Sequence, residues 1–394
     1  MGRPLAMYKH FPSFGIECDV LTVKPVAYRQ YEPELLRDLD TKRIYRAGSH
    51  DPQRLMYMLG VRRVRDAAIN RGRRVTEWFF PDPKAGWVRA AVRLGRTLAT
   101  NRHYRCIITT SPPISAHLVG RAVSTEFNLP WIADFRDFWT GYRAEDWFAS
   151  GRQVRRAKNL LEDIAGRSAT MTAVSPAIAD YLGKGNVIYN SYDDDRAKLW
   201  KSPAPGDYFI IGVLGTLDEL RPIEPLFELL SYVRRHRPDR FEKIRVRLVG
   251  SNNLPEFEPL VARYQLTDRV ESFGSQKRER TIALLSDASM LYIGLAPPHN
   301  TWLVTGRVFD MLASGRPILA ATPQESVLGR LLSETRNSCL FDENLWAEAS
   351  DYIVARMAEY ERGDLQLHSV PTYAEEYSST KMVEKFAGLI GEIS

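Results

Sequence analysis

Short runs of apolar residues alternate along most of the chain with segments in which apolar residues recur every three or four positions. The short runs predict buried strands, and the periodic segments predict amphipathic helices. Strands that alternate with helices favour a parallel sheet covered by helices over a sandwich or a helical bundle. In the first half we expect strands over 19–23, 104–110, 130–135, 170–174 and 187–190.

The second half repeats the pattern, with strands expected over 209–214, 244–249, 270–273, 290–295, 317–321 and 338–341. Helices are expected over 115–127 and 373–393. A further helix should begin after Ser175, a good N-cap followed by Pro176, and end near Gly183.

A polar stretch over 193–207, which contains Lys-Ser-Pro-Ala-Pro-Gly, separates the two halves and predicts a domain linker. A length of 394 residues suits two domains. We therefore predict an α/β protein with two doubly wound, Rossmann-like domains, residues 1–195 and 208–370. Ligands of such sheets bind at the carboxyl ends of the strands, so we expect a cleft there.

The composition, 44% hydrophobic and 26% charged, is that of a folded soluble protein. The chain has neither an apolar run long enough to span a membrane nor an amino-terminal signal sequence, which predicts a cytoplasmic protein. Cys18, Cys106 and Cys339 lie singly in apolar runs, so we expect buried thiols. No cofactor and no metal site are expected.

The net charge of +6 is unevenly distributed. Six arginines lie between Arg62 and Arg74, and four cations lie between Arg152 and Lys158. Such blocks usually form a solvated face. The alternative is attraction to anionic lipid headgroups through Arg62–Arg74, which would make the protein peripheral on the inner face of the cell membrane. Nucleic acid is not expected, because no nucleic-acid-binding motif accompanies the charge.

Residues 305–321 combine a turn of small residues, an amphipathic helix, a glycine stop and an apolar strand. The turn at Thr305 and Gly306 can point backbone N–H groups at a phosphate, and Arg307 adds a guanidinium. Asp310, one turn further on, can accept hydrogen bonds from ribose hydroxyls. The alternative is an ordinary helix and strand in which Arg307 and Asp310 form a solvated pair.

This segment resembles the donor-binding motif of the retaining glycosyltransferases of family 4, of the bacterial surface-polysaccharide type. Ser111-Pro-Pro-Ile-Ser-Ala-His117 and Pro130-Trp-Ile-Ala-Asp-Phe-Arg-Asp-Phe-Trp139 resemble the acceptor side of the same enzymes. The resemblance implies the GT-B fold, with acceptor binding in 1–195 and nucleotide-sugar binding in 208–370. It also implies that a helix within 371–394 packs back on the N-terminal domain.

The chain departs from the family pattern in three ways. Asp310 replaces a glutamate, and Trp302 replaces another glutamate eight positions earlier. Residues 4–14 resemble the first helix of the family. The strand and glycine-rich loop that open the family's fold do not precede them, so we expect a start further upstream or a fragment. The resemblance therefore supports donor binding better than catalysis.

The resemblance also assigns donor-side residues in other loops. A basic residue after the strand 209–214 should hold the diphosphate; the alternative for Arg221 is a pair with Glu219. The loop after 270–273 should receive the nucleotide base. The alternative for Lys277 in this loop is a solvated cation at the start of a helix. The polar groups before the phosphate turn can contact sugar hydroxyls, although such a loop is equally ordinary. These donor-side candidates are Gly215, Thr216, Arg221, Gly274, Ser275, His299 and Asn300.

On the acceptor side, Asp134, Arg136 and Asp137 follow one strand. Asp137 is the first candidate to orient or deprotonate the acceptor hydroxyl, and Arg136 can hold an acidic acceptor. A structural Asp–Arg pair is the alternative. His117 is the second catalytic candidate, with a packing role as its alternative, and the resemblance places Asn190 near the cleft.

We therefore predict a metal-independent glycosyltransferase that moves a sugar from a nucleotide-diphosphate sugar to a saccharide or lipid-linked saccharide acceptor. One alternative is a GT-B-fold sugar-nucleotide epimerase, which needs more carboxylates and histidines than we can place. Another is a non-catalytic GT-B protein that binds a nucleotide sugar or a partner enzyme. Hydrolases, kinases and metalloenzymes are not expected, because no catalytic triad, P-loop or metal-ligand spacing is present.

Overall fold

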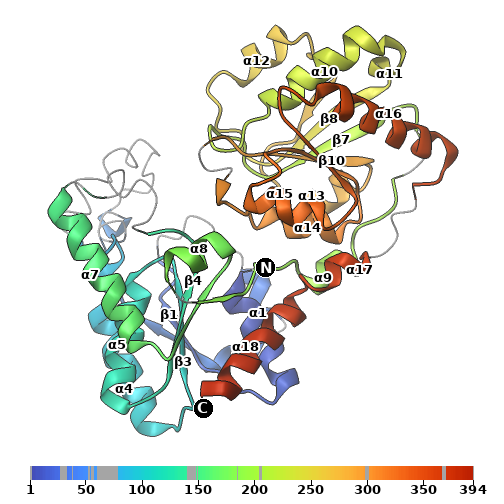
Figure 1. Ribbon diagram of the computed structural model, residues 1–394. Helices are drawn as coiled ribbons and strands as arrows, with labels where there is room; N and C mark the ends of the chain where they lie inside the picture. The colour runs from blue at the N-terminus through green and yellow to red at the C-terminus, as the bar shows by residue number, and fades with distance from the viewer. Residues whose placement is uncertain are drawn as a thin grey trace. The chain divides into compact units, whose positions relative to one another are not determined.

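The computed structural model describes residues 2–26, 33–37, 39–51, 54, 57–59, 79–139, 148, 150–183, 185–203, 206–297, 301–365 and 370–393. They form two compact units (Figure 1). The N-terminal unit comprises Gly2–Tyr189 and Val383–Ser394, and the C-terminal unit comprises Asn190–Met382. The chain therefore passes between the units twice, after Tyr189 and after Met382.

The N-terminal unit has a parallel four-stranded sheet in the order β3-β4-β5-β6, among the residues described. A separate parallel pair, β1 and β2, lies in the same unit. The strands are β1 (Val20–Val23), β2 (Ile44–Ala47), β3 (Ile107–Ser111), β4 (Trp131–Phe135), β5 (Thr170–Ala173) and β6 (Asn186–Val187). The helices are α1 (Arg3–His10), α4 (Val88–Asn101), α5 (Ser115–Phe127), α7 (Gly151–Arg167) and α8 (Pro176–Tyr181), with the short 3-10 segments η1 (Phe11–Phe14), η2 (Pro33–Leu36), η3 (Thr41–Arg43) and η5 (Ala85–Trp87).

The C-terminal unit has a parallel six-stranded sheet in the order β12-β11-β10-β7-β8-β9, within the described part of the chain. Its strands are β7 (Phe209–Leu214), β8 (Ile244–Val249), β9 (Val270–Ser272), β10 (Met290–Gly294), β11 (Ile318–Ala321) and β12 (Ser338–Phe341). Its helices are α9 (Asp194–Ala197), α10 (Glu224–His236), α11 (Pro238–Glu242), α12 (Phe257–Arg263), α13 (Arg278–Leu285), α14 (Arg307–Ala313), α15 (Val327–Ser333), α16 (Trp346–Arg362) and α17 (Thr372–Glu375).

The last helix, α18 (Ser379–Ile393), begins in the C-terminal unit and ends in the N-terminal unit. Phe386 is fully buried there, with the guanidinium of Arg3 5.1 Å from its ring centre. The predicted two-domain α/β fold with a returning C-terminal helix is confirmed.

Two predicted helices are each interrupted. Residues 4–14 form α1 followed by η1, and 373–393 divide into α17 and α18. The second break has a tertiary cause, because the Asp194 carboxylate accepts hydrogen bonds from the Thr380 N–H at 3.0 Å and from the Ser379 and Thr380 hydroxyls. A side chain from α9 thus caps the start of α18.

Close packing in the N-terminal unit depends on Gly120 of α5. A Cβ atom added there would lie 2.4 Å from Cγ2 of Thr109 and 2.8 Å from Nε1 of Trp131. Trp131 is 1% exposed and its indole N–H donates to the Thr109 hydroxyl at 2.7 Å. Glycine therefore lets α5 lie directly on β3 and β4.

Gly120→Ala is expected to lower the free energy of unfolding by about 1–3 kcal/mol, because the added methyl group must displace Thr109 or Trp131. Gly166→Ala is the matched control, since Gly166 lies in α7 with no heavy atom near the added Cβ. That change should raise stability by up to about 1 kcal/mol. Urea denaturation measures both, and equal effects would contradict the packing role of Gly120.

Candidate functional site

The loop after β7 lies at the carboxyl edge of the C-terminal sheet, where ligands of parallel sheets bind. Gly215 has a φ of +92°, which favours glycine. A Cβ on Gly250, after β8, would lie 1.9 Å from the Gly215 carbonyl oxygen. The two loops therefore meet backbone to backbone, and the hydroxyls of Thr216 and Ser251 lie 2.8 Å apart. Sequence analysis did not identify Gly250 or Ser251.

Arg307, the first residue of α14, holds this loop. Its Nη1 donates to the Leu214 carbonyl at 2.5 Å and its Nη2 to the Thr216 carbonyl at 3.1 Å. A Cβ on Gly215 would lie 2.8 Å from Cζ of Arg307, so the guanidinium lies against the glycine. Guanidinium has five N–H donors, and these two bonds leave the others for a ligand.

Arg221 lies in the same loop and is paired with an acid. Its backbone N–H and Nε each donate to the Asp218 carboxylate at 3.0 Å, and Nη2 contacts the second oxygen. Burial raises the pKa of Asp218, but hydrogen bonds and charge from Arg221 outweigh this and lower it. Glu219, the partner considered from the sequence, is exposed.

The two guanidiniums lie close enough to interact. Burial, together with the charge of Arg221, lowers the pKa of Arg307 to about 10, against the opposing effect of Asp218. An anion bound beside the pair would relieve this repulsion and raise the pKa of Arg307 again. Two cations therefore lie at the loop after β7: Arg221 within it, and Arg307 of α14, which is held by two carbonyls of the loop.

Thr305 lies just before α14 and Asp310 lies in its first turn, and each has a polar group that can contact a ligand. The Thr305 hydroxyl is buried and has no hydrogen-bond partner among the residues described. Asp310 is half-buried, and burial raises its pKa, which the charges of Arg278 and Arg196 partly offset. Gly306 is exposed at the N-cap.

The remaining donor-side candidates are less closely placed. Gly274, with a φ of +62°, and exposed Ser275 follow β9, at the edge of the sheet. Trp302 is half-buried ahead of the phosphate turn. His299 and Asn300 lie outside the described residues, as does Arg62–Arg74.

In the N-terminal unit, Asp134 lies inside the sheet rather than on an acceptor surface. Its carboxylate accepts from Arg3 at 2.9 Å and from the hydroxyls of Thr110 and Thr172 at 2.7 Å each. Asp134 is 0% exposed and Arg3 is 2% exposed. Arg3 also donates to the Ile188 carbonyl at 2.7 Å, so this pair joins α1 to β3, β4, β5 and the segment after β6. Its position supports a structural role in place of the predicted acceptor contact.

His117 is also inside the core. It is 0% exposed, its Nδ1 lies 2.7 Å from the Thr109 hydroxyl, and its ring centre lies 4.5 Å from that of Phe135. Burial lowers its pKa to about 3, so the ring is neutral at physiological pH. The position therefore supports packing rather than the predicted proton transfer.

Arg136 and Asp137 differ in their contacts. Arg136 donates to the carbonyls of Ser111 at 3.0 Å and Pro112 at 2.9 Å, so it fixes the Pro-Pro turn instead of pairing with an aspartate. Asp137 is exposed and makes no hydrogen bond or ion pair with any residue that the structure describes. It is the predicted acid of this unit that is left for an acceptor. Half-buried Asn190 begins the C-terminal unit.

Sequence analysis also missed Asp82. Its two carboxylate oxygens accept from the Ser115 N–H at 2.7 Å and the Ser115 hydroxyl at 2.9 Å. Asp82 therefore caps α5 from a distant segment, and its spacing from Ser115 gives no local capping pattern.

No family model matches the sequence, and no curated protein sequence matches it. Solved structures do match. Sucrose-phosphate synthase from Thermosynechococcus elongatus has a TM-score of 0.62 at 15% identity, over 98% of this chain and 91% of that chain. The α,α-trehalose 6-phosphate synthase of Burkholderia multivorans has a TM-score of 0.55 at 10% identity, over 80% of this chain and 78% of that chain.

The fold is GT-B. A third GT-B structure, the pneumococcal O-GlcNAc transferase in complex with UDP and GlcNAc, matches with a TM-score of 0.50 at 11% identity, over 79% of this chain and 60% of that chain. At such identities the likeness establishes the GT-B fold of this chain and not its substrates.

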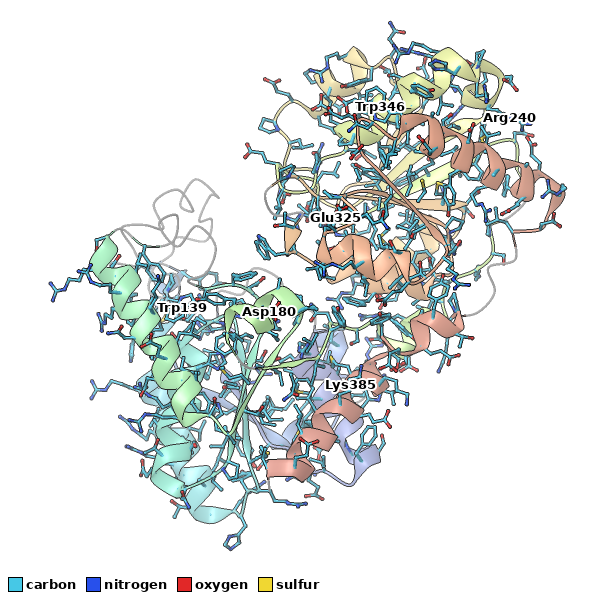
Figure 2. All side chains as sticks on the ribbon, viewed as in Figure 1. Trp139, Asp180, Arg240, Glu325, Trp346 and Lys385 are labelled. Carbon is cyan, nitrogen blue, oxygen red and sulfur yellow. The ribbon has the colours of Figure 1, made fainter. Side chains whose placement is uncertain are left out.

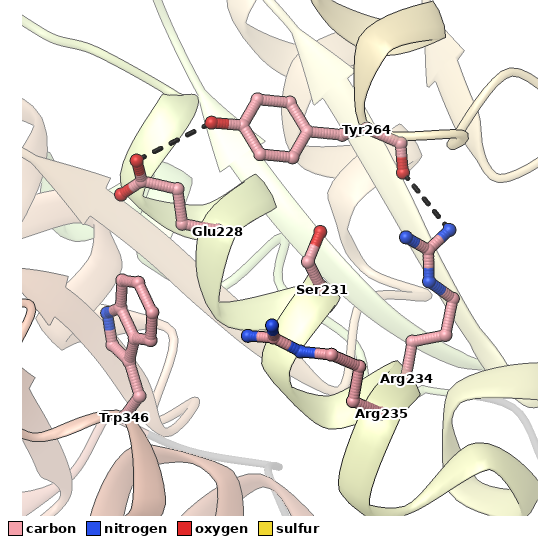
Figure 3. Close-up of a pocket in the computed structure, with 6 residues that line it drawn as sticks. All are labelled: Glu228, Ser231, Arg234, Arg235, Tyr264 and Trp346. Atoms are coloured by element: carbon pink, nitrogen blue, oxygen red, sulfur yellow. Dashed lines mark hydrogen bonds between the residues drawn. The ribbon is translucent and has the colours of Figure 1, made fainter.

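This GT-B chain also has a hollow of about 220 Å³ between α10, α12 and α16 in the C-terminal unit (Figure 3). None of the predicted site residues lines it. Its lining residues are Glu228, Ser231, Arg234, Arg235, Tyr264 and Trp346.

Among the described helices, none is both long and apolar enough to span a bilayer.

Asp134→Asn is expected to lower the free energy of unfolding by about 3–5 kcal/mol, because it leaves the buried Arg3 charge uncompensated. Urea denaturation followed by tryptophan fluorescence measures the loss. The double variant Arg3→Met, Asp134→Asn removes both charges and should recover part of the stability. Unchanged stability of the single variant would contradict the structural role.

His117 predicts a pH dependence of stability. Its folded pKa of about 3 lies below the ordinary 6.5, so the unfolded chain binds the proton more tightly. Stability should therefore fall as pH decreases below about 6.5, by up to ~1.4 kcal/mol per pH unit. Denaturation at pH 5, 6 and 7 should show a shallower slope for His117→Gln than for the parent. His103→Gln, at an exposed position, is the control, and an identical change in slope there would reject the assignment.

Proposed function

We propose that this GT-B protein is a glycosyltransferase that moves a sugar from a nucleotide-diphosphate sugar to a saccharide or lipid-linked saccharide. The observation that supports this most directly is that Arg307, at the start of α14, lies against the loop after β7 that carries Arg221. Similarity to the retaining enzymes of family 4 favours retention of the anomeric configuration and a role in bacterial surface-polysaccharide synthesis.

Sugar transfer leaves negative charge on the departing diphosphate, so catalysis requires fixed donors where that charge develops. Arg307 meets this requirement because backbone carbonyls already hold its guanidinium in place. Little reorganisation is then needed when the diphosphate arrives. Arg221 supplies a second cation, and the Thr305 hydroxyl, which has no partner among the described residues, supplies a neutral donor.

The nucleoside and acceptor contacts follow the same logic. We assign Asp310 to the ribose hydroxyls, because its half-buried carboxylate has no hydrogen-bond partner among the described residues. The loop at Gly274 and Ser275 is assigned to the base. On the acceptor side, Asp137 is the group that remains exposed and unpaired, so it is our candidate to orient or deprotonate the acceptor hydroxyl. No metal or cofactor enters this scheme.

A second candidate function is nucleotide-sugar binding without turnover. It is favoured by the burial of His117 and Asp134, which leaves Asp137 as the one predicted proton acceptor exposed in the described N-terminal unit. Incubation with a panel of UDP-, GDP- and ADP-sugars distinguishes the two functions. Release of nucleoside diphosphate supports the transferase, whereas tight binding with no release from any donor supports the binding protein.

Arg221→Ala and Arg307→Ala are each expected to weaken binding of the matching nucleoside diphosphate by about 1.5–3 kcal/mol, because each removes a charge-assisted hydrogen bond. Titration calorimetry with UDP, GDP and ADP measures the affinity. Arg280→Ala removes an exposed cation of α13 and should leave affinity unchanged. Unchanged affinity of both site variants would reject the phosphate assignment.

A further inference from the structure

The helices α4, α5 and α7 lie side by side on the N-terminal unit (Figure 1). Together they contain nine arginines and lysines and three acidic residues. Their charge surplus therefore equals the net charge of +6 carried by the whole chain. This helical layer therefore carries a surplus of positive charge as large as that of the whole chain.

Ion pairs neutralise one end of this layer. Arg96 of α4 pairs with Glu126 of α5 at 2.7 Å, and Asp163 of α7 pairs with Arg167 at 2.6 Å and also with Arg121 of α5. Most of these residues lie towards the carboxyl-terminal ends of their helices. Because α5 and α7 follow strands of a parallel sheet, their carboxyl-terminal ends lie at its amino edge.

The opposite end of the layer carries cations without acidic partners. Arg89 and Arg93 of α4, and Arg152, Arg155 and Lys158 of α7, are exposed and form no ion pair with residues that the structure describes. All five lie in the amino-terminal halves of their helices. This end is the carboxyl edge of the sheet, since α4 leads into β3 and α7 follows β4.

Cations at these positions do not stabilise their own helices. The amino terminus of a helix carries partial positive charge, so cations there are destabilising. The first turn of α7 has no acidic residue, and the Ser150 hydroxyl accepts from the Gln153 N–H at its start. By contrast, α10 has its cations, Arg234 and Arg235, in its last turn, where they complement the dipole. Among the described residues, the charge at the start of α7 therefore has no ion pair and no dipole contact that stabilises it.

The start of α7 is nevertheless firmly held. The Arg156 guanidinium lies 4.0 Å from the ring centre of Phe80. Trp139 packs between Phe80 and Phe148, with ring centres at 6.3 and 6.0 Å. The aromatic cluster fixes the backbone beneath the exposed cations, so they form a preorganised surface (Figure 2 shows Trp139 beside this helix).

We propose that the amino-terminal halves of α4 and α7 bind the surface of a bilayer that contains anionic lipids. Two separate helices, with α5 between them, present the cations, and a broad anionic surface can contact both at once. Single-stranded nucleic acid is instead held by a groove that follows its backbone. Given the proposed function with a lipid-linked acceptor, this contact would bring exposed Asp137 close to the lipid headgroups.

The test is co-sedimentation of the intact protein with vesicles of phosphatidylcholine alone and of 70:30 phosphatidylcholine:phosphatidylglycerol. The triple variant Arg152→Gln, Arg155→Gln, Lys158→Gln removes charge from α7. The matched control, Arg235→Gln, Arg280→Gln, Arg336→Gln, removes the same charge from exposed positions of the C-terminal unit. Circular dichroism checks that both variants are folded.

The parent protein should bind the anionic vesicles and not the neutral ones. At roughly fivefold in partition coefficient per basic residue, the α7 variant should bind about a hundredfold more weakly, and the control should change little. Equal loss in both variants, equal binding to neutral vesicles, or tighter binding to single-stranded RNA that competes with vesicles would overturn the proposal. Calorimetry with nucleoside diphosphate is independent of this contact, so failure of the proposed function would appear there alone.

Discussion

Backbone carbonyls at or just after the ends of several parallel strands of this protein accept hydrogen bonds from arginine side chains. A buried carbonyl without a donor is costly, so each strand end that is covered by protein needs one. Arg3 donates to Ile188 and Tyr189 after β6, Arg136 to Ser111 at the end of β3, and Arg307 to Leu214 at the end of β7. These guanidiniums hold the loops on which the candidate site is built.

The same constraint separates structural from functional arginines. Arg3 is enclosed by Asp134, two carbonyls and the Phe386 ring, so its donors face protein. Arg307 is held by two carbonyls but lies half-buried beside Arg221, where burial and like charge lower its pKa. A guanidinium that is fixed, incompletely bonded and repelled by its neighbour is suited to an anionic ligand. Arg3 is 2% exposed whereas Arg307 is half-buried, so access for a ligand distinguishes these two arginines.

The sequence predicted the elements whose pattern is local. The strands Phe209–Leu214 and Ile244–Val249 and the helix Ser115–Phe127 have the bounds expected, because unbroken apolar runs or a clear helical period define them. β2 was missed because Ile44–Ala47 is short and contains an arginine, and β6 is shorter than expected. The break before α18 depends on Asp194, which is far away in the sequence, so no local pattern indicates it.

The same contrast between local patterns and distant contacts separates the site residues that were predicted correctly from those that were not. Gly215, Arg221 and Arg307 were found because a motif places them near strand ends, and the structure brings them into one loop cluster. Sequence reasoning gave Asp134 an acceptor role because its partner, Arg3, is 131 positions away. An acid at a strand end has the same local sequence whether it faces solvent or a buried cation.

Charge on the helical layer of the N-terminal unit shows how stability and function can coexist on one surface. Arg96, Arg121 and Arg167 pair with acids at the amino edge of the sheet, where they help to join neighbouring helices. The cations at the carboxyl edge instead oppose the dipole of α7 and depend on an aromatic cluster to keep their helix in place. Arginine is therefore neutralised where the fold alone needs it and left exposed beside the edge where substrates of parallel sheets bind. Charges that served only solubility would not need to be paired at the amino edge and exposed at the carboxyl edge.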